Sequence, residues 1–256
     1  MRKNALWVEF DGRSSMGFDV YQVNFENGLM QTETIIPDRS INKVQRQNSS
    51  VVDFYSVTNS PLTFSVIFYC DKELTEERKV EIIKWLNKST YRTMRFETMP
   101  DNYYYAIATK IDVTHDTMEK GYFTAEFECN SPYAYTEVLM SDEYTITDKI
   151  EVDIVSNSVF ETPIIKIIGT INEDSDFSIK SQTNDTELNF TELKAGTKFT
   201  IDCLNHNIYA WDADGKEILL QGNKQSHSWL VFEPGNNHLW CDGKCDFQIF
   251  WQGNRV

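Results

Sequence analysis

The sequence has few of the residues on which common catalytic and nucleotide-binding motifs depend. It holds 11 glycines in 256 residues, and no two are closer than Gly12 and Gly17. Neither the G-x-G-x-x-G fingerprint nor the complete phosphate-loop motif G-x-x-x-x-G-K-[ST] is present. The four histidines are not spaced as in metalloproteases, and no Gly-x-Ser-x-Gly nucleophile elbow occurs. The chain is therefore predicted not to be an enzyme and to need no cofactor.

Long apolar runs are also missing. No stretch approaches the roughly 20 residues that a membrane-spanning helix needs. The first nine residues include Arg2 and Lys3 but lack the apolar segment of a signal peptide. The sequence predicts a soluble protein that is made in the cytoplasm and does not insert into membranes.

The sequence has few cysteines, and their number is odd. The five thiols are scattered over a long chain, which is atypical of disulfide-stapled secreted domains. Reduced, mostly buried cysteines are expected. One alternative is a zinc site in which His238, Cys241 and Cys245 converge with Cys203. The preferred interpretation is a β-turn bracketed by two half-buried thiols, with no metal, because the C-x₃-C spacing has no matching second pair.

Basic residues are fewer than acidic ones, and the difference is larger in the second half of the chain. The net charge is −15. Residues 1–136 hold 15 basic and 19 acidic side chains, whereas residues 137–256 hold 9 basic and 20 acidic ones. Such a chain repels phosphate backbones and anionic lipid, so neither nucleic acid nor a membrane surface is an expected partner.

The stretch from Pro61 to Glu97 predicts a strand, a helix and a second strand. Thr75 is placed to cap the helix, Glu76 and Glu77 favour its first turn, and Lys84 and Lys88 favour its end. The predicted apolar stripe that would lie on a sheet consists of Val80, Ile82, Ile83, Trp85 and Leu86. A single helix cannot cover a large sheet, so the rest of the chain must pack β on β.

Strand patterns occupy most of the remaining chain. Residues 103–113 and 122–130 alternate with a period of two, which predicts a hairpin, and Pro132 ends the pattern. The second half has many short β-prone runs, Ser228–Phe232 among them, separated by turn dipeptides. We expect a mainly β protein: residues 1–136 form a β-sandwich-like domain with one α-helix, and residues 137–256 a second, jelly-roll-like β-sandwich.

One polar segment, at about residues 31–51, is unusual inside a compact domain. It lacks acidic residues after Asp38 and carries Arg39, Lys43 and Arg46. Two interpretations have similar weight: a solvated loop, or an ordered arm whose basic side chains meet acidic groups on a neighbouring subunit.

Tryptophan gives a second candidate site. Trp211 and Trp229 lie in the second half, and sugar-binding sandwiches often stack a sugar ring on an exposed indole. Trp211 follows this pattern best because it precedes the Asp212–Gly215 turn. Trp251 alternates with Phe247 and Ile249 and is expected to face inward. The alternative function is therefore a carbohydrate-binding adhesin.

The order of several segments along both halves is similar to one known family. They are Leu62–Val66 before the Thr-capped helix, Phe127–Tyr135, Thr162–Ile167, Ile201–Cys203, Asp214–Gly215 and Leu230–Asn237. With these segments the chain resembles the distal tail proteins of long-tailed bacteriophages that infect Gram-positive hosts.

This resemblance implies a structural role in the virion. Such proteins form a six-fold ring at the tip of the tail tube. The first domain builds the ring with an arm that clasps the next subunit, which corresponds here to about residues 31–51. The second is a galectin-like sandwich that holds receptor-binding or baseplate components. The implied partners are copies of the chain itself, the tail tube protein, the tail-tip protein and the receptor-binding proteins. The protein would be made in the host cytoplasm and reside in the phage tail.

Overall fold

A computed structural model describes residues 6–23, 38–46, 50–115, 121–160, 164–220 and 228–255. The chain divides into two compact units, one ending at Ala134 and one running from Tyr135 to Arg255. Strands dominate both, and the described residues contain one α-helix, so the predicted mainly β fold class is confirmed. No helix in this part of the chain is long and apolar enough to span a bilayer.

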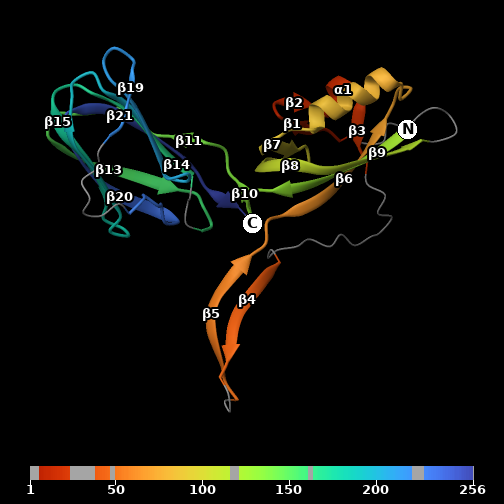
Figure 1. Cartoon of the computed structure of the whole chain (residues 1–256), viewed down its shortest axis with the longest axis horizontal. Helices are drawn as coiled ribbons and strands as arrows, with labels where there is room; N and C mark the ends of the chain where they lie inside the picture. Colours follow the sequence, from red (N-terminus) through yellow and green to blue (C-terminus); the bar gives the residue numbers. More distant parts are fainter. Residues whose placement is uncertain are drawn as a thin grey trace. The chain divides into compact units, whose positions relative to one another are not determined.

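The first unit is built around one antiparallel sheet with the order β2-β1-β7-β8-β9-β6-β3 (Figure 1). An isolated antiparallel bridge between Leu6 and Gln22 joins the chain just before β1 to β3, so the sheet closes into a barrel. The elements of this unit are β1 (Val8–Phe10), β2 (Arg13–Ser14), the 3₁₀ helix η1 (Ser15–Phe18), β3 (Val20–Gln22), β4 (Arg39–Gln45), β5 (Val52–Asn59), β6 (Thr63–Cys70), α1 (Glu76–Leu86), β7 (Arg92–Phe96), β8 (Met99–His115) and β9 (Gly121–Cys129).

Helix α1 begins where the sequence predicts. The Thr75 side chain accepts a hydrogen bond from the Arg78 backbone N–H, and two glutamates occupy the first turn. Its packing face is narrower than expected. Ile82, Trp85 and Leu86 are buried, but Val80 and Ile83 are 47% and 42% exposed. The prediction that these two residues lie on the sheet was wrong. Only the side chains on the side of the helix that faces the barrel are buried.

Strands β8 and β9 form the predicted hairpin. Alternate residues of β9 are buried, among them Phe123 and Phe127. On β8 the register shifts between Ala108 and Lys110, so one bulge changes which residues face inward along this 17-residue strand.

The second unit contains two antiparallel sheets that share one hydrophobic core. One sheet has the order β13-β20-β15-β16. The other has the order β11-β21-β14-β17-β18-β19, with β12 also pairing with β21. From the junction between the units onward, the strands are β10 (Ala134–Tyr135), β11 (Leu139–Met140), β12 (Tyr144–Ile146), β13 (Lys149–Ser156), β14 (Ile164–Ile171), β15 (Ser175–Ser181), β16 (Glu187–Leu193), β17 (Lys198–Asp202), β18 (Asn207–Trp211), β19 (Glu217–Ile218), β20 (Gly235–Asp242), β21 (Cys245–Gln252) and β22 (Asn254–Arg255).

Aromatic side chains from both sheets meet in this core. The Phe177 ring centre lies 5.1 Å from that of Phe199 and 6.0 Å from that of Phe247. Trp251 is buried, as its alternation predicted. The predicted strand at Ser228–Phe232 was wrong. This apolar run buries Leu230 and Phe232 without forming a strand of its own, because burial alone does not require strand pairing.

Candidate functional site

Strands β4 and β5 form a hairpin that pairs with no other strand of the described chain (Figure 1). Its register runs from Arg39 opposite Asn59 to Gln45 opposite Val52. The backbone N–H of Ser60 donates to the Asp38 carbonyl oxygen at 2.7 Å and closes the base. The described part of the predicted arm lies in this hairpin, which continues past residue 51 to Asn59. Residues 31–37 and 47–49 of that arm lie outside the described residues.

One face of the hairpin is polar apart from Val44, and its polar side chains contact one another. The Asn42 amide donates to the Ser56 hydroxyl at 2.9 Å and to the Thr58 hydroxyl at 3.4 Å. Arg46 forms an ion pair with Asp53. These contacts hold the two strands together and leave little unmet hydrogen-bonding capacity on this face.

The opposite face, which we call the apolar face, carries Ile41, Val52, Phe54 and Val57. Ile41 pairs with Val57, Lys43 with Phe54, and Gln45 with Val52, and cross-strand partners project from the same face. The exposed fractions are 57% for Ile41, 64% for Phe54 and 41% for Val57. A small hairpin with apolar side chains on one face and no core beneath them is typical of a surface that binds another molecule.

The three basic residues predicted for the arm separate onto two faces. The register puts Arg39 and Lys43 on the apolar face, whereas Arg46 lies on the polar face with Asp53. Sequence reasoning missed Phe54 and Val57. Because the predicted arm stopped at residue 51, the alternating apolar residues of the returning strand, Val52 and Phe54, were not counted with it.

A pocket of about 540 Å³ opens at the base of this hairpin, within the first unit. Its polar lining includes Asp38 and Ser60, the two residues that close the hairpin, and Gln22, whose buried side-chain oxygen has no hydrogen-bond partner among the described residues. Its apolar lining is formed by Leu62, Phe64, Val66, Phe96, Met99 and Tyr104. Strand β6 begins and β7 ends here, so the pocket lies at the end of the barrel opposite α1.

The two predicted sugar-stacking tryptophans lie in different settings. Trp211, on β18, is half-buried between Lys198 and Glu217 on the neighbouring strands. Trp229 is also half-buried, and its ring stacks on His206 with the ring centres 4.8 Å apart. Within the described residues, Trp211 and Trp229 have different partners and do not stack on each other. Carbohydrate binding through them stays a prediction.

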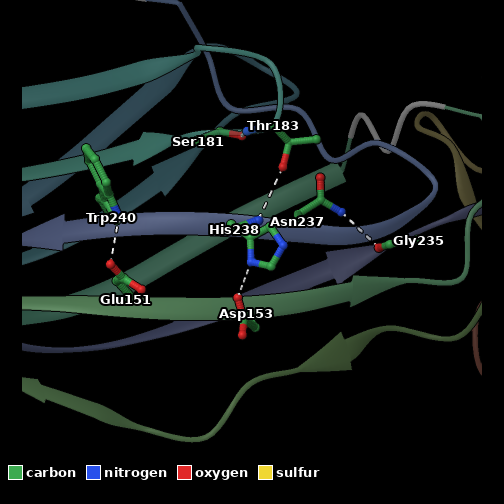
Figure 2. Close-up of polar contacts among 8 residues, drawn as sticks. All are labelled: Glu151, Asp153, Ser181, Thr183, Gly235, Asn237, His238 and Trp240. Carbon is green, nitrogen blue, oxygen red and sulfur yellow. Dashed lines mark hydrogen bonds and ion pairs between the residues drawn. The ribbon is translucent and has the colours of Figure 1, made fainter.

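A third tryptophan, Trp240, lies on the outer face of the β13-β20-β15-β16 sheet (Figure 2). Its indole N–H donates to Glu151 at 3.2 Å, and the Lys149 ammonium lies 4.5 Å from the ring centre. The neighbouring His238 ring contacts the Asp153 carboxylate. One face of the indole is therefore occupied by Lys149.

The cysteines are not arranged for metal binding. All five are free and buried, as expected for reduced cysteines, but Cys241 and Cys245, which were predicted to be half-buried, are fully buried. Burial raises the pKa of Cys203, Cys241 and Cys245 to about 12, so these three thiols are protonated at neutral pH. Within the described ranges, no group of three or more His, Cys, Asp or Glu side chains is placed to hold a metal ion.

Comparison with protein families identifies the first unit. Residues 4–131 match a family described as phage tail protein N-terminal domain. The chain belongs to this family. No curated protein matches it by sequence.

Solved structures with the same fold extend the likeness to both units. The crystal structure of the Dit protein of phage SPP1, described as a paradigm of the hub adsorption apparatus in Gram-positive infecting phages, has a TM-score of 0.71 and 12% identity. The alignment covers 99% of this chain and 100% of SPP1 Dit. A chain of the phage P2 baseplate, in its activated conformation with Ca, has a TM-score of 0.56 and 10% identity, with coverage of 96% and 97%. Family and fold together confirm the resemblance predicted from the sequence.

Proposed function

We infer that the protein is a hub component of a phage tail and that its copies associate head to tail into a ring through the β4–β5 hairpin. The observation that carries this proposal is the exposed apolar face of that hairpin. Fully burying an aliphatic or aromatic side chain stabilises a complex by about 1.5–3 kcal/mol. The four side chains are 40–64% exposed, so burying what remains exposed contributes part of this amount at each position and favours contact between subunits.

Ring geometry follows from the use of two different surfaces on each copy. The hairpin is one surface, and it contacts a different surface on the next copy. Such an interface is heterologous, and it generates a closed ring when the rotation between successive copies adds up to a full turn. A hexamer of this 29.8 kDa chain would have a mass of about 180 kDa. The likeness of the whole chain to SPP1 Dit supports a hub role in the virion.

In this proposal the second unit is a galectin-like sandwich that carries the tail-tip and receptor-binding proteins, while the first unit meets the tail tube. The chain is made in the host cytoplasm before assembly. It performs no catalytic step: its function is to connect and position other tail components.

The test compares two charge-matched valine substitutions by sedimentation velocity and electron microscopy. Val57→Asp places a carboxylate on the apolar face, and we expect it to weaken self-association by at least about tenfold, or about 1.4 kcal/mol. Val155→Asp is the control, because Val155 is 62% exposed on β13. Rings that form equally well from both variants would contradict the proposal, as would a wild-type chain that stays monomeric at every concentration.

A further inference from the structure

The residues that line the pocket at the base of the hairpin indicate what kind of ligand it would bind. Its walls are apolar and aromatic, the buried side-chain oxygen of Gln22 has no donor among the described residues, and the exposed residue Asp38 lies at its edge. Leaving a buried acceptor unpaired costs about 1–3 kcal/mol. A suitable occupant therefore combines an aromatic or aliphatic side chain with a cationic or N–H donor.

The apolar face of the β4–β5 hairpin combines these groups. Phe54 is 64% exposed, and Lys43 lies directly opposite it on the neighbouring strand. Neither Lys43 nor Asp38 forms an ion pair within the part of the chain that the structure describes. The hairpin thus carries an aromatic side chain beside an available cation, and the pocket offers an apolar space beside an available carboxylate.

Phe54 cannot enter the pocket of its own chain without disrupting the hairpin. Ser60 lines that pocket, and six residues of extended strand separate it from Phe54. At about 3.3 Å per residue, the separation is roughly 20 Å. Backbone pairing from Arg39 to Gln45 prevents β5 from folding back. Phe54 of the same chain is therefore excluded as the occupant, whereas Phe54 of a second copy is not.

We propose that the pocket is the receptor for the hairpin of a neighbouring copy, which inserts Phe54 between the aromatic walls and places Lys43 against Asp38. This inference rests on the proposed function, and it identifies the surface of the neighbouring copy that the hairpin contacts. One copy's hairpin occupies the next copy's pocket, and the same contact repeats around the ring.

A charge-reversal series in the full-length chain tests the pairing. Lys43→Glu and Asp38→Lys should each weaken self-association by at least about tenfold, a size found for close charge pairs across interfaces. The double variant K43E/D38K restores opposite charges at every contact and keeps the net charge. We expect it to associate within about threefold of wild type. A double variant as weak as the weaker single variant would overturn the proposal.

A second measurement asks which chain provides the occupant. Cysteines introduced at positions 43 and 38 together should form disulfides between chains under mild oxidation, giving a ladder on a non-reducing gel. The five native cysteines are buried, so they do not compete in the folded protein. A disulfide within one chain would overturn the proposal.

A pocket variant separates failure of this inference from failure of the proposed function. Met99 is 44% exposed in the pocket lining, so Met99→Glu should leave folding intact and weaken association. If Val57→Asp abolishes assembly while Met99→Glu and Asp38→Lys leave it unchanged, the hairpin still mediates assembly but binds elsewhere. If all three leave assembly unchanged, the proposed function fails as well.

Discussion

At the residue scale, burial separates the side chains that stabilise this protein from those available to a partner. Trp85 is 1% exposed and Trp251 7%, and all five cysteines are buried. Phe54, in contrast, is one of the most exposed aromatic residues. Residues of similar hydrophobicity therefore have different roles, and burial is the property that distinguishes them.

Trp85 should be important for stability because it both fills space and satisfies a polar group. Its indole N–H donates to the buried Phe10 carbonyl oxygen at 2.9 Å. Trp85→Phe removes this donor and leaves a void, so we expect the free energy of unfolding to fall by about 2–4 kcal/mol. Urea denaturation followed by circular dichroism measures the change. The control is Trp240→Phe on the exposed sheet face, where a loss as large would contradict the argument.

The buried thiols predict how stability depends on alkaline pH. Burial raises the pKa of Cys129, Cys203, Cys241 and Cys245 from the ordinary 9.0 to about 12. Between these pKa values the unfolded chain loses thiol protons that the folded chain keeps. The free energy of unfolding is therefore unaffected by these thiols below about pH 9 and falls as the pH rises toward 12. Melting temperatures measured across this range should therefore decrease. Substituting one of these cysteines with alanine should make the decrease shallower, and an unchanged slope would count against this cause.

At the element scale, packing between neighbouring strands of one sheet in the second unit leaves no space at some positions. Gly169 on β14 lies against the ring of Phe199 on the adjacent strand. A Cβ atom at this position would lie 2.5 Å from that ring and 2.8 Å from the Asp246 carbonyl oxygen. Phe199 itself packs on Phe177, so it cannot move away freely.

Gly169→Ala should therefore destabilise the second unit. We expect a loss of about 1–3 kcal/mol from overpacking, measured as a lower melting temperature in calorimetry. Gly17→Ala is the control, because a Cβ there meets no atom within 4 Å. Equal melting temperatures for the two variants would show that β14 adjusts without cost.

The elements also show what the sequence could reveal. The start of α1 depends on neighbouring residues such as Thr75 and Arg78, so it could be predicted. The two faces of the β4–β5 hairpin could not, since one bulge after Asn42 decides which residues of β5 share a face with Lys43. The pocket joins Gln22, Asp38 and Phe96 from distant parts of the chain, and no local pattern indicates that they meet.

At the scale of the whole molecule, charge opposes the association that the hairpin favours. Each copy carries a net charge of −15, so copies brought together in a ring repel one another. Salt screens this repulsion: the Debye length falls from about 30 Å at 0.01 M to about 10 Å at 0.1 M. A contact driven mainly by apolar burial is little affected by the same screening.

Self-association should therefore strengthen as salt is raised over this range. Sedimentation equilibrium at several ionic strengths measures the effect, and K43E/D38K, which has the same net charge, should show the same trend. Association that weakens steadily with salt would mean that ion pairs, and not the apolar face, supply most of the binding free energy.

The hairpin is also ordered before any neighbour binds. Asn42 bridges its strands, Arg46 pairs with Asp53, and the Asn59 amide donates to the Tyr133 hydroxyl at the base. A segment that became ordered only on contact would lose roughly 1–2 kcal/mol of backbone conformational entropy per residue at that moment. Here folding has already fixed those residues, so assembly should proceed as rigid-body docking, with an unchanged far-ultraviolet circular dichroism spectrum.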